Sequence, residues 1–293
     1  MNTNSRAAIL IVSSMTMISS NDAILKISSQ SLGVGQLLFI RGMFAAMLFM
    51  LIIRLTGRPV ISGSVVNRWN LFRATCECLA TFCFVTSLGV LPIATASTLV
   101  WTAPIFLTIC SALFLGEKVS ISRWVAVFVG FIGVLLVTNP FGGDFSWVMV
   151  LPMMSAGFVV VRDMTTRRID NEVHSVYIVL ATLLLVGLVG GLTSFFDWRT
   201  VNSTQLSWLV LSACLLSTGF YFQIKAVRMG EMSFIAPFLF TGILVAMVWG
   251  YLIWDQIPNL TMTAGIVLII GSGLYVLTGQ RMSRRRLRTM QPH

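Results

Sequence analysis

The stretch PIATASTLVWTAPIFLTICSALFLGEK, from Pro92 to Lys118, is long enough to cross a bilayer and carries a tryptophan and a proline near its centre. A second stretch, EMSFIAPFLFTGILVAMVWGYLIWDQ, from Glu231 to Gln256, has the same plan. When Gly116-Glu117-Lys118 is laid on Trp254-Asp255-Gln256, the offset is 138 residues, about half of the 293-residue chain. The offset indicates that one membrane unit occurs twice.

The composition around these stretches is that of a membrane protein. Hydrophobic residues make up 56% of the chain, charged residues only 10%, and the mean hydropathy is +0.88. A soluble domain carries about 25% charged residues. The apolar residues form runs of about 20, the length that crosses about 30 Å of hydrocarbon as a helix. The sequence therefore predicts an all-α polytopic membrane protein embedded in a lipid bilayer.

Polar residues, glycines and prolines divide the chain into ten predicted transmembrane helices. The first five are expected at about residues 6–29, 34–55, 67–89, 92–115 and 120–138, and the second five at about 145–166, 173–196, 204–228, 231–253 and 261–279. This division predicts a first five-helix repeat at 1–140, a second at 141–280 and a basic cytoplasmic tail at 281–293.

The basic residues test this count, because cytoplasmic loops carry an excess of lysine and arginine. With the N-terminus inside, the inner breaks hold Arg6, Arg54, Arg58, Arg68, Lys118, Arg123, Arg167, Arg168, Lys225, Arg228 and the five arginines of the tail. The outer breaks hold only Lys26 and Arg199. Both ends are thus expected in the cytoplasm, and the net charge of +10 is explained by topology rather than by binding of nucleic acid. Because five is odd, the two repeats must be inverted, as in many secondary transporters.

The pattern LGVLPIATASTLVWTAPIFLTICSALFLGEKVS, with its mid-helix Pro104 and terminal Gly116-Glu117, resembles the EamA-type repeat of the drug/metabolite transporter superfamily. Within it the chain is most similar to the YddG-type exporters of aromatic amino acids. The resemblance implies a ten-helix basket around a central cavity, in the cytoplasmic (inner) membrane of a bacterium. It also implies hairpins that swing to open opposite faces. We expect a monomer without cofactors.

Candidate substrate contacts come from polar and aromatic side chains at helical spacing. Ser97, Trp101, Pro104 and Thr108 share one stripe, and its polar members indicate a cavity wall, although Trp101 facing lipid is the alternative. Aromatic and amide groups of this kind suit an amphipathic solute, although ordinary helix packing explains any one of them. The predicted substrate contacts are Asn21, Cys78, Phe82, Ser97, Trp101, Phe220, Tyr221 and Gln223.

Charges and prolines within the spans are the candidates for coupling and gating. Pro104 and Pro237 each remove a backbone hydrogen bond, giving either a static kink or a gating hinge. Glu77 either neutralises Arg73 one turn earlier or carries a coupling proton, and Arg41 and Arg162 also lie near membrane depth. The remaining candidates are two acid–base pairs, Asp22 with Lys26 and Asp163 with Arg167. We expect them at opposite mouths of the central cavity, where they act either as gates or as structural pairs whose side chains snorkel toward the membrane surface.

The sequence bears on three classes of function: carrier, intramembrane enzyme and channel. A carrier exporting small amphipathic metabolites, above all aromatic or neutral amino acids, is favoured by the inverted repeat, the prolines and the resemblance. A broader drug or metabolite exporter with proton coupling is the alternative. An intramembrane enzyme would need a catalytic or metal motif, and with only His174 and His293 we expect neither catalysis nor a metal site. A channel is disfavoured because no filter sequence is present.

Overall fold

The structure, a computed structural model, describes residues 3–57, 59, 65, 67–103, 105–106, 109–110, 121–139, 146–166, 169, 173, 175–195, 197–229 and 238–289. Within these residues ten α-helices and one short 3-10 helix have defined bounds, and further helical residues occur at 65, 103, 105–106, 109–110 and 238–239. The predicted all-α class is therefore confirmed.

The helices follow the predicted order. In the first half they are α1 (Thr3–Ser28), α2 (Val34–Leu55), α3 (Arg68–Leu88), α4 (Ile93–Val100) and α6 (Ile121–Thr138). In the second half the 3-10 helix η2 (Trp147–Met149) leads into α7 (Val150–Thr166), followed by α8 (Ser175–Ser194), α9 (Ser203–Met229), α11 (Thr241–Trp254) and α12 (Leu260–Thr289). The last helix continues well past its predicted end near residue 279.

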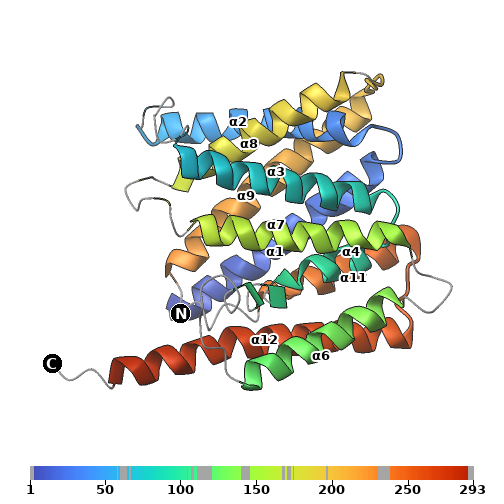
Figure 1. The fold of residues 1–293 in the computed structure, drawn as a ribbon. Helices are drawn as coiled ribbons and strands as arrows, with labels where there is room; N and C mark the ends of the chain where they lie inside the picture. Colours follow the sequence, from blue (N-terminus) through green and yellow to red (C-terminus); the bar gives the residue numbers. More distant parts are fainter. Residues whose placement is uncertain are drawn as a thin grey trace.

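Six of these helices are long and apolar enough to cross a membrane. They are the helical segments Ser5–Ser29, Val34–Leu55, Arg68–Leu88, Trp147–Thr165, Val176–Ser194 and Ser203–Gln223. Three shorter segments, Trp124–Thr138, Thr241–Trp254 and Leu260–Ser272, are also apolar helices. In Figure 1, α1 begins and α12 ends on the same side of the molecule, as an even number of crossings requires.

The helices pack in pairs that join the two halves. α1 packs on α9 and α7 packs on α3, while α2 packs on α8, α4 on α11 and α6 on α12. Figure 1 shows α6 with α12 at one edge of the molecule and α2 with α8 at the other. Exchanging the first five helices with the second five leaves this set of pairs unchanged. The arrangement is the one that a two-fold related repeat produces, and the repeat boundaries themselves stay a prediction.

Two hydrogen bonds join the halves at equivalent places. Ser14 Oγ on α1 donates to the Gly219 carbonyl on α9 at 2.7 Å. Ser155 Oγ on α7 donates to the Ala80 carbonyl on α3 at 2.9 Å. A buried hydroxyl thus fixes the first helix of each half against the third helix of the other half.

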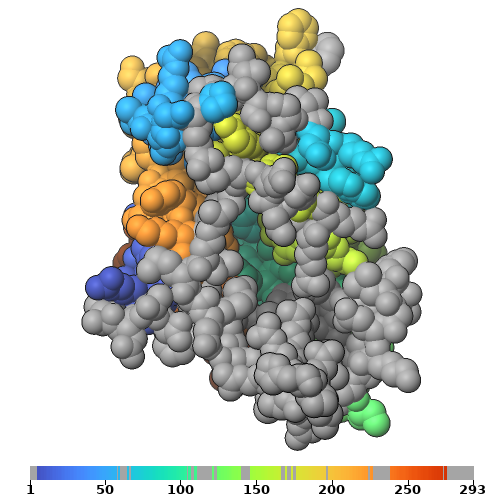
Figure 2. Space-filling model, turned by 90° about the vertical axis from the view of Figure 1, so that its left-hand side faces the viewer, coloured from blue at the N-terminus to red at the C-terminus, as the bar shows by residue number. Residues whose placement is uncertain are grey.

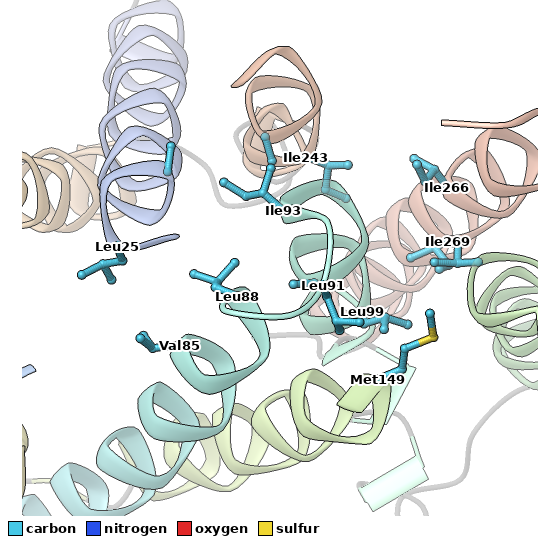
Figure 3. Close-up of a cluster of buried hydrophobic side chains, with 14 of the residues drawn as sticks. Leu25, Val85, Leu88, Leu91, Ile93, Leu99, Met149, Ile243, Ile266 and Ile269 are labelled. Carbon is cyan, nitrogen blue, oxygen red and sulfur yellow. The ribbon is translucent and has the colours of Figure 1, made fainter. Parts of the chain in front are cut away.

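The main hydrophobic core is formed by residues of both halves of the chain. Leu25, Val85 and Leu88 reach it from α1 and α3, and Leu99 from α4. Ile243, Ile266 and Ile269 of α11 and α12 close it from the second half, and Figure 3 shows these side chains converging. Because lipid is as apolar as this core, close packing rather than expulsion of water holds such helices together.

Glycines allow α2 and α8 to approach closely. A Cβ placed on Gly190 would lie 2.7 Å from the Gly35 carbonyl oxygen and 2.8 Å from the Phe39 backbone nitrogen. A Cβ on Gly42 would lie 2.9 Å from the Gly187 Cα. These glycines therefore serve packing within the chain.

The fourth predicted helix is broken in the structure. α4 ends at Val100, and Trp101 and Thr102 form a turn before helical residues resume at 103. Thr102 fixes the turn, since its Oγ1 donates to the Leu99 carbonyl at 2.6 Å. A proline at 104 has no N–H to donate to the Val100 carbonyl, which is a physical reason for the helix to end there. Pro104 itself lies outside the described residues.

The ninth predicted helix is broken in the corresponding place. Residues 238 and 239 are helical, Phe240 is in a turn, and α11 begins at Thr241. At the offset of 138 residues, Phe240 corresponds to Thr102. The predicted hinge Pro237 and the predicted gate residue Arg167 both lie outside the described residues, so their roles stay predictions.

Candidate functional site

A cavity of about 210 Å³ lies at the centre of the bundle. Its lining comes from α1, α2, α3, α7, α8, α9 and α11 together with the α4 region. In the view of Figure 2, onto the end where α1 begins, the surface between α9 (orange) and α7 (yellow-green) is hollowed, and teal surface of the α4 region lies deeper in the hollow. The same three elements contribute to the lining of the cavity.

A polar cluster occupies one end of the cavity. Asn21 of α1 is its centre, because Asn21 Oδ1 accepts from Ser212 Oγ of α9 at 2.6 Å and from Arg41 Nη1 of α2 at 3.5 Å. Asn21 Nδ2 donates to Asp22 Oδ1 at 3.0 Å. The cluster ties three helices together and places a carboxylate and a guanidinium on the cavity wall.

A second charged group joins α3 and α7. Arg162 Nη1 contacts Glu77 Oε2 at 2.6 Å, and Arg162 Nη2 contacts Asp163 Oδ1 at 2.8 Å. Glu77 and Arg162 line the cavity, with side chains 15% and 22% exposed. Arg73, the sequence-based candidate for the partner of Glu77, also donates to Thr182 Oγ1 at 2.9 Å. The short ion pair of Glu77 therefore crosses between the two halves.

The other end of the cavity is aromatic and apolar. Trp101 lines it together with Met15 of α1, Phe84 of α3 and Phe220 of α9. The Trp101 ring also packs on Phe240, with centroids 5.9 Å apart and ring planes inclined by 51°. Met15 and Asp22 are both on the cavity face of α1 and seven residues apart, so the two ends are separated by about 10 Å along the helix.

Ser97 contributes an unpaired hydroxyl to the cavity wall. It is 6% exposed, it lines the cavity, and its Oγ has no hydrogen-bond partner among the described residues. A buried hydroxyl without a partner costs free energy, and a bound solute or water can offset that cost.

Lys26 does not pair with Asp22 in this conformation. Its Nζ donates to the carbonyls of Leu88 and Leu91, at 2.7 and 2.5 Å, and lies 5.3 Å from the ring centroid of Trp254. Leu88 and Leu91 flank the turn between α3 and α4, and Trp254 ends α11. Lys26 therefore connects α1, the α3–α4 turn and α11 at the end of the bundle opposite the start of α1.

Four of the predicted substrate contacts line the cavity: Asn21, Ser97, Trp101 and Phe220. Cys78 and Phe82 instead lie in the main hydrophobic core, since α3 turns Glu77, Thr81 and Phe84 to the cavity. The residues of α3 that face the cavity thus begin one position earlier than expected, at Glu77 and Thr81 rather than at Cys78 and Phe82.

The two remaining predicted contacts lie on α9. Tyr221 is 50% exposed, with its ring 5.8 Å from Lys225 Nζ, and Gln223 is half-buried. Neither is among the described residues that line the cavity. Their contact with substrate, like that of Cys78 and Phe82, stays a prediction.

Arg162, Arg41, Ser212 and Thr182 were not among the predicted site residues, although they hold the polar groups in place. A signal for Arg162 was present in the sequence. Asp22 and Asp163 are 141 residues apart, and the same offset places Arg162 opposite Asn21. Ser212 and Thr182 gave no comparable signal, because single hydroxyls are common in membrane helices.

The first half of the chain matches a known family. Residues 5–139 match the EamA-like transporter family. Over its full length the fold resembles a protein of known crystal structure, with a TM-score of 0.64 at 15% identity, covering 96% of this chain and 99% of the other.

Characterised relatives are transporters with different cargoes. The riboflavin transporter of Vibrio cholerae is 28% identical over 201 residues, which cover 68% of this chain and 67% of the relative. The pseudopaline exporter of Pseudomonas aeruginosa is 27% identical over 259 residues, 85% and 88% of the two chains. The S-adenosylmethionine uptake transporter of Rickettsia conorii is 23% identical over 199 residues, 68% of each.

These relatives are transporters and not enzymes, as expected from the sequence. Their cargoes differ from one another, so the similarity extends to the family and not specifically to the YddG-type exporters.

Proposed function

We propose that this protein, whose residues 5–139 match the EamA-like transporter family, is a multi-pass secondary transporter of a small amphipathic metabolite. The cavity carries the proposal. Its polar end holds Asp22 and Arg41, and its aromatic end holds Trp101. A solute that spans both ends presents charged groups at one end and an apolar body at the other.

Amino acids with an aromatic or neutral side chain are the cargo we favour. The cavity volume of about 210 Å³ is below the range of about 300–1,000 Å³ typical of pockets for drug-sized ligands. The carboxylate of Asp22 forms no ion pair among the described residues and is available to a substrate ammonium group. A broader metabolite exporter coupled to protons is the second candidate, and the riboflavin and S-adenosylmethionine relatives favour a larger cargo.

Export by alternating access is the direction and mechanism we propose. The pseudopaline exporter covers more of this chain than the riboflavin and S-adenosylmethionine transporters do. The excess of basic residues in alternate loops supports cytoplasmic termini in a bacterial inner membrane. The helix breaks at Trp101–Thr102 and Phe240 meet through the Trp101–Phe240 ring contact, and they are the points at which we propose that the helices bend.

Transport by the purified protein in liposomes tests this function. The vesicles are loaded with one solute and assayed for exchange against labelled tryptophan, phenylalanine, threonine, riboflavin and S-adenosylmethionine. We expect saturable exchange of one of the amino acids. Exchange of riboflavin or S-adenosylmethionine alone would replace the amino-acid assignment, and no exchange of any member by folded protein would contradict the proposal. A proton gradient of either sign, imposed in the same assay, separates coupled from uncoupled transport.

A further inference from the structure

Arg41 is a buried cation within a membrane span. It lies on α2 at the polar end of the cavity, it is 5% exposed, and it lines the cavity. A guanidinium at this depth is costly unless its N–H groups and its charge are satisfied.

The hydrogen bonds of Arg41 are incomplete. Its Nη1 reaches Asn21 Oδ1 only at 3.5 Å, and that oxygen already accepts a shorter bond of 2.6 Å from Ser212. Its Nε is buried without a hydrogen-bond partner among the described residues. Within the same residues no carboxylate oxygen lies within 4 Å of the Arg41 guanidinium.

Among the described residues, neither acid of the cavity lining forms an ion pair with Arg41. Glu77 is paired with Arg162 at 2.6 Å, and Asp22 accepts from Asn21 at 3.0 Å. The charged residues of the lining are Asp22, Glu77, Arg41 and Arg162, so their formal charges cancel. The wall is therefore neutral as a whole, but one of its cations lacks an anion within contact distance.

We propose that Arg41 binds the acidic group of the transported solute, either a carboxylate or a phosphate. The role rests on the proposed transport function. Nε and the terminal nitrogens of a guanidinium present a planar fork that matches two oxygens of such a group. The apolar part of the solute then extends about 10 Å along α1 toward Trp101. Asn21 and Ser212 position Arg41 from the side away from the acidic group.

Binding to the purified protein in detergent, measured by calorimetry, tests this role independently of transport. Two pairs of probes differ only in the acidic group: tryptophan against tryptophanamide for a carboxylate, and riboflavin 5′-phosphate against riboflavin for a phosphate. We expect the anionic member of one pair to bind about tenfold to a hundredfold tighter than its partner, the range for hydrogen bonds to charged groups. The pair that shows the preference identifies the source of the anion.

Arg41→Gln is expected to abolish the preference, whereas Arg54→Gln, an exposed arginine near the end of the same helix, is expected to keep it. Arg41→Lys keeps the positive charge but lacks the planar guanidinium, so the ratio of the two affinities should be intermediate. The proposal is overturned if wild-type protein shows no preference for the anionic member of either pair, absence of binding included, or if Arg41→Gln retains the preference. A preference for the anion without exchange in liposomes would instead contradict the transport function alone.

Discussion

The Trp101 and Phe240 rings lie with centroids 5.9 Å apart and planes inclined by 51°, and each residue stands at a break in its own helix. One break belongs to the first half and the other to the second. Trp101 lines the aromatic end of the cavity, and Phe240 packs against its ring. Movement at either break would change the shape of the cavity, which links substrate contact to conformational change.

Replacing Trp101 tests the aromatic end. Trp101→Ala should lower transport efficiency about tenfold, since an aromatic contact worth about 1.4 kcal/mol corresponds to a factor of ten. Initial rates of exchange in liposomes measure the effect, with gel filtration to show that the variant is folded. Trp101→Phe keeps a ring and should retain most of the rate. Unchanged kinetics in Trp101→Ala would remove this residue from the site.

The ion pair between Glu77 and Arg162 should contribute to stability. Glu77→Gln leaves Arg162 with Asp163 as its remaining carboxylate, so we expect a loss of about 1–3 kcal/mol, visible as a lower melting temperature in detergent. A double variant, Glu77→Arg with Arg162→Glu, restores a pair across α3 and α7 and should recover part of the loss. A proton-carrying role alone predicts a different pattern, namely normal melting with altered dependence of transport on the proton gradient.

Lys26 should hold one end of the cavity shut. Lys26→Met removes both bonds to the α3–α4 turn and the contact with Trp254, so that end should open more often. In a variant without the native cysteines, a cysteine introduced by Ser97→Cys reports the opening through its rate of reaction with a membrane-impermeant maleimide. We expect a several-fold faster reaction in Lys26→Met. Equal rates with and without Lys26 would exclude this latch, and Lys26→Arg serves as the charge-conserving control.

Adding one methyl group at the contact between α2 and α8 should destabilise the protein. A Cβ at Gly190 would lie 2.7 Å from a backbone oxygen and 2.8 Å from a backbone nitrogen, and backbone moves less easily than a side chain. Gly190→Ala should cost about 1–3 kcal/mol and lower the melting temperature. Gly157→Ala on α7 is the matched control, because nothing lies within 4 Å of its Cβ position. A normal melting temperature for Gly190→Ala would contradict the packing described here.

The sequence predicted the helices well because long apolar runs broken by polar residues leave little choice of structure in a bilayer. With no water to bond the backbone, each run must form a helix or a closed barrel. The observed starts of α2 at Val34 and α9 at Ser203 lie within one residue of those expected. The sequence predicted the helix breaks at Trp101 and Phe240 only in part. A proline indicates that a helix is interrupted nearby, but it does not fix the residue at which the interruption occurs.

The site was predicted in outline and not in detail. Spacing along one helix assigned Ser97 and Trp101 to a common wall, and both line the cavity. Spacing alone did not decide the orientation of α3, where Cys78 lies in the core and Glu77 lines the cavity, because it groups residues by face without saying which face turns inward.

The sequence by itself determined the class of fold, the number of helices and the presence of costly charges at membrane depth, because each depends on local composition. Tertiary structure decided which charges meet. Arg162 pairs with Glu77 from the other half of the chain, and Arg41 is left with an unpaired Nε at the cavity wall. Such partners come from helices far apart in sequence, so only their packing against one another brings them within bonding distance.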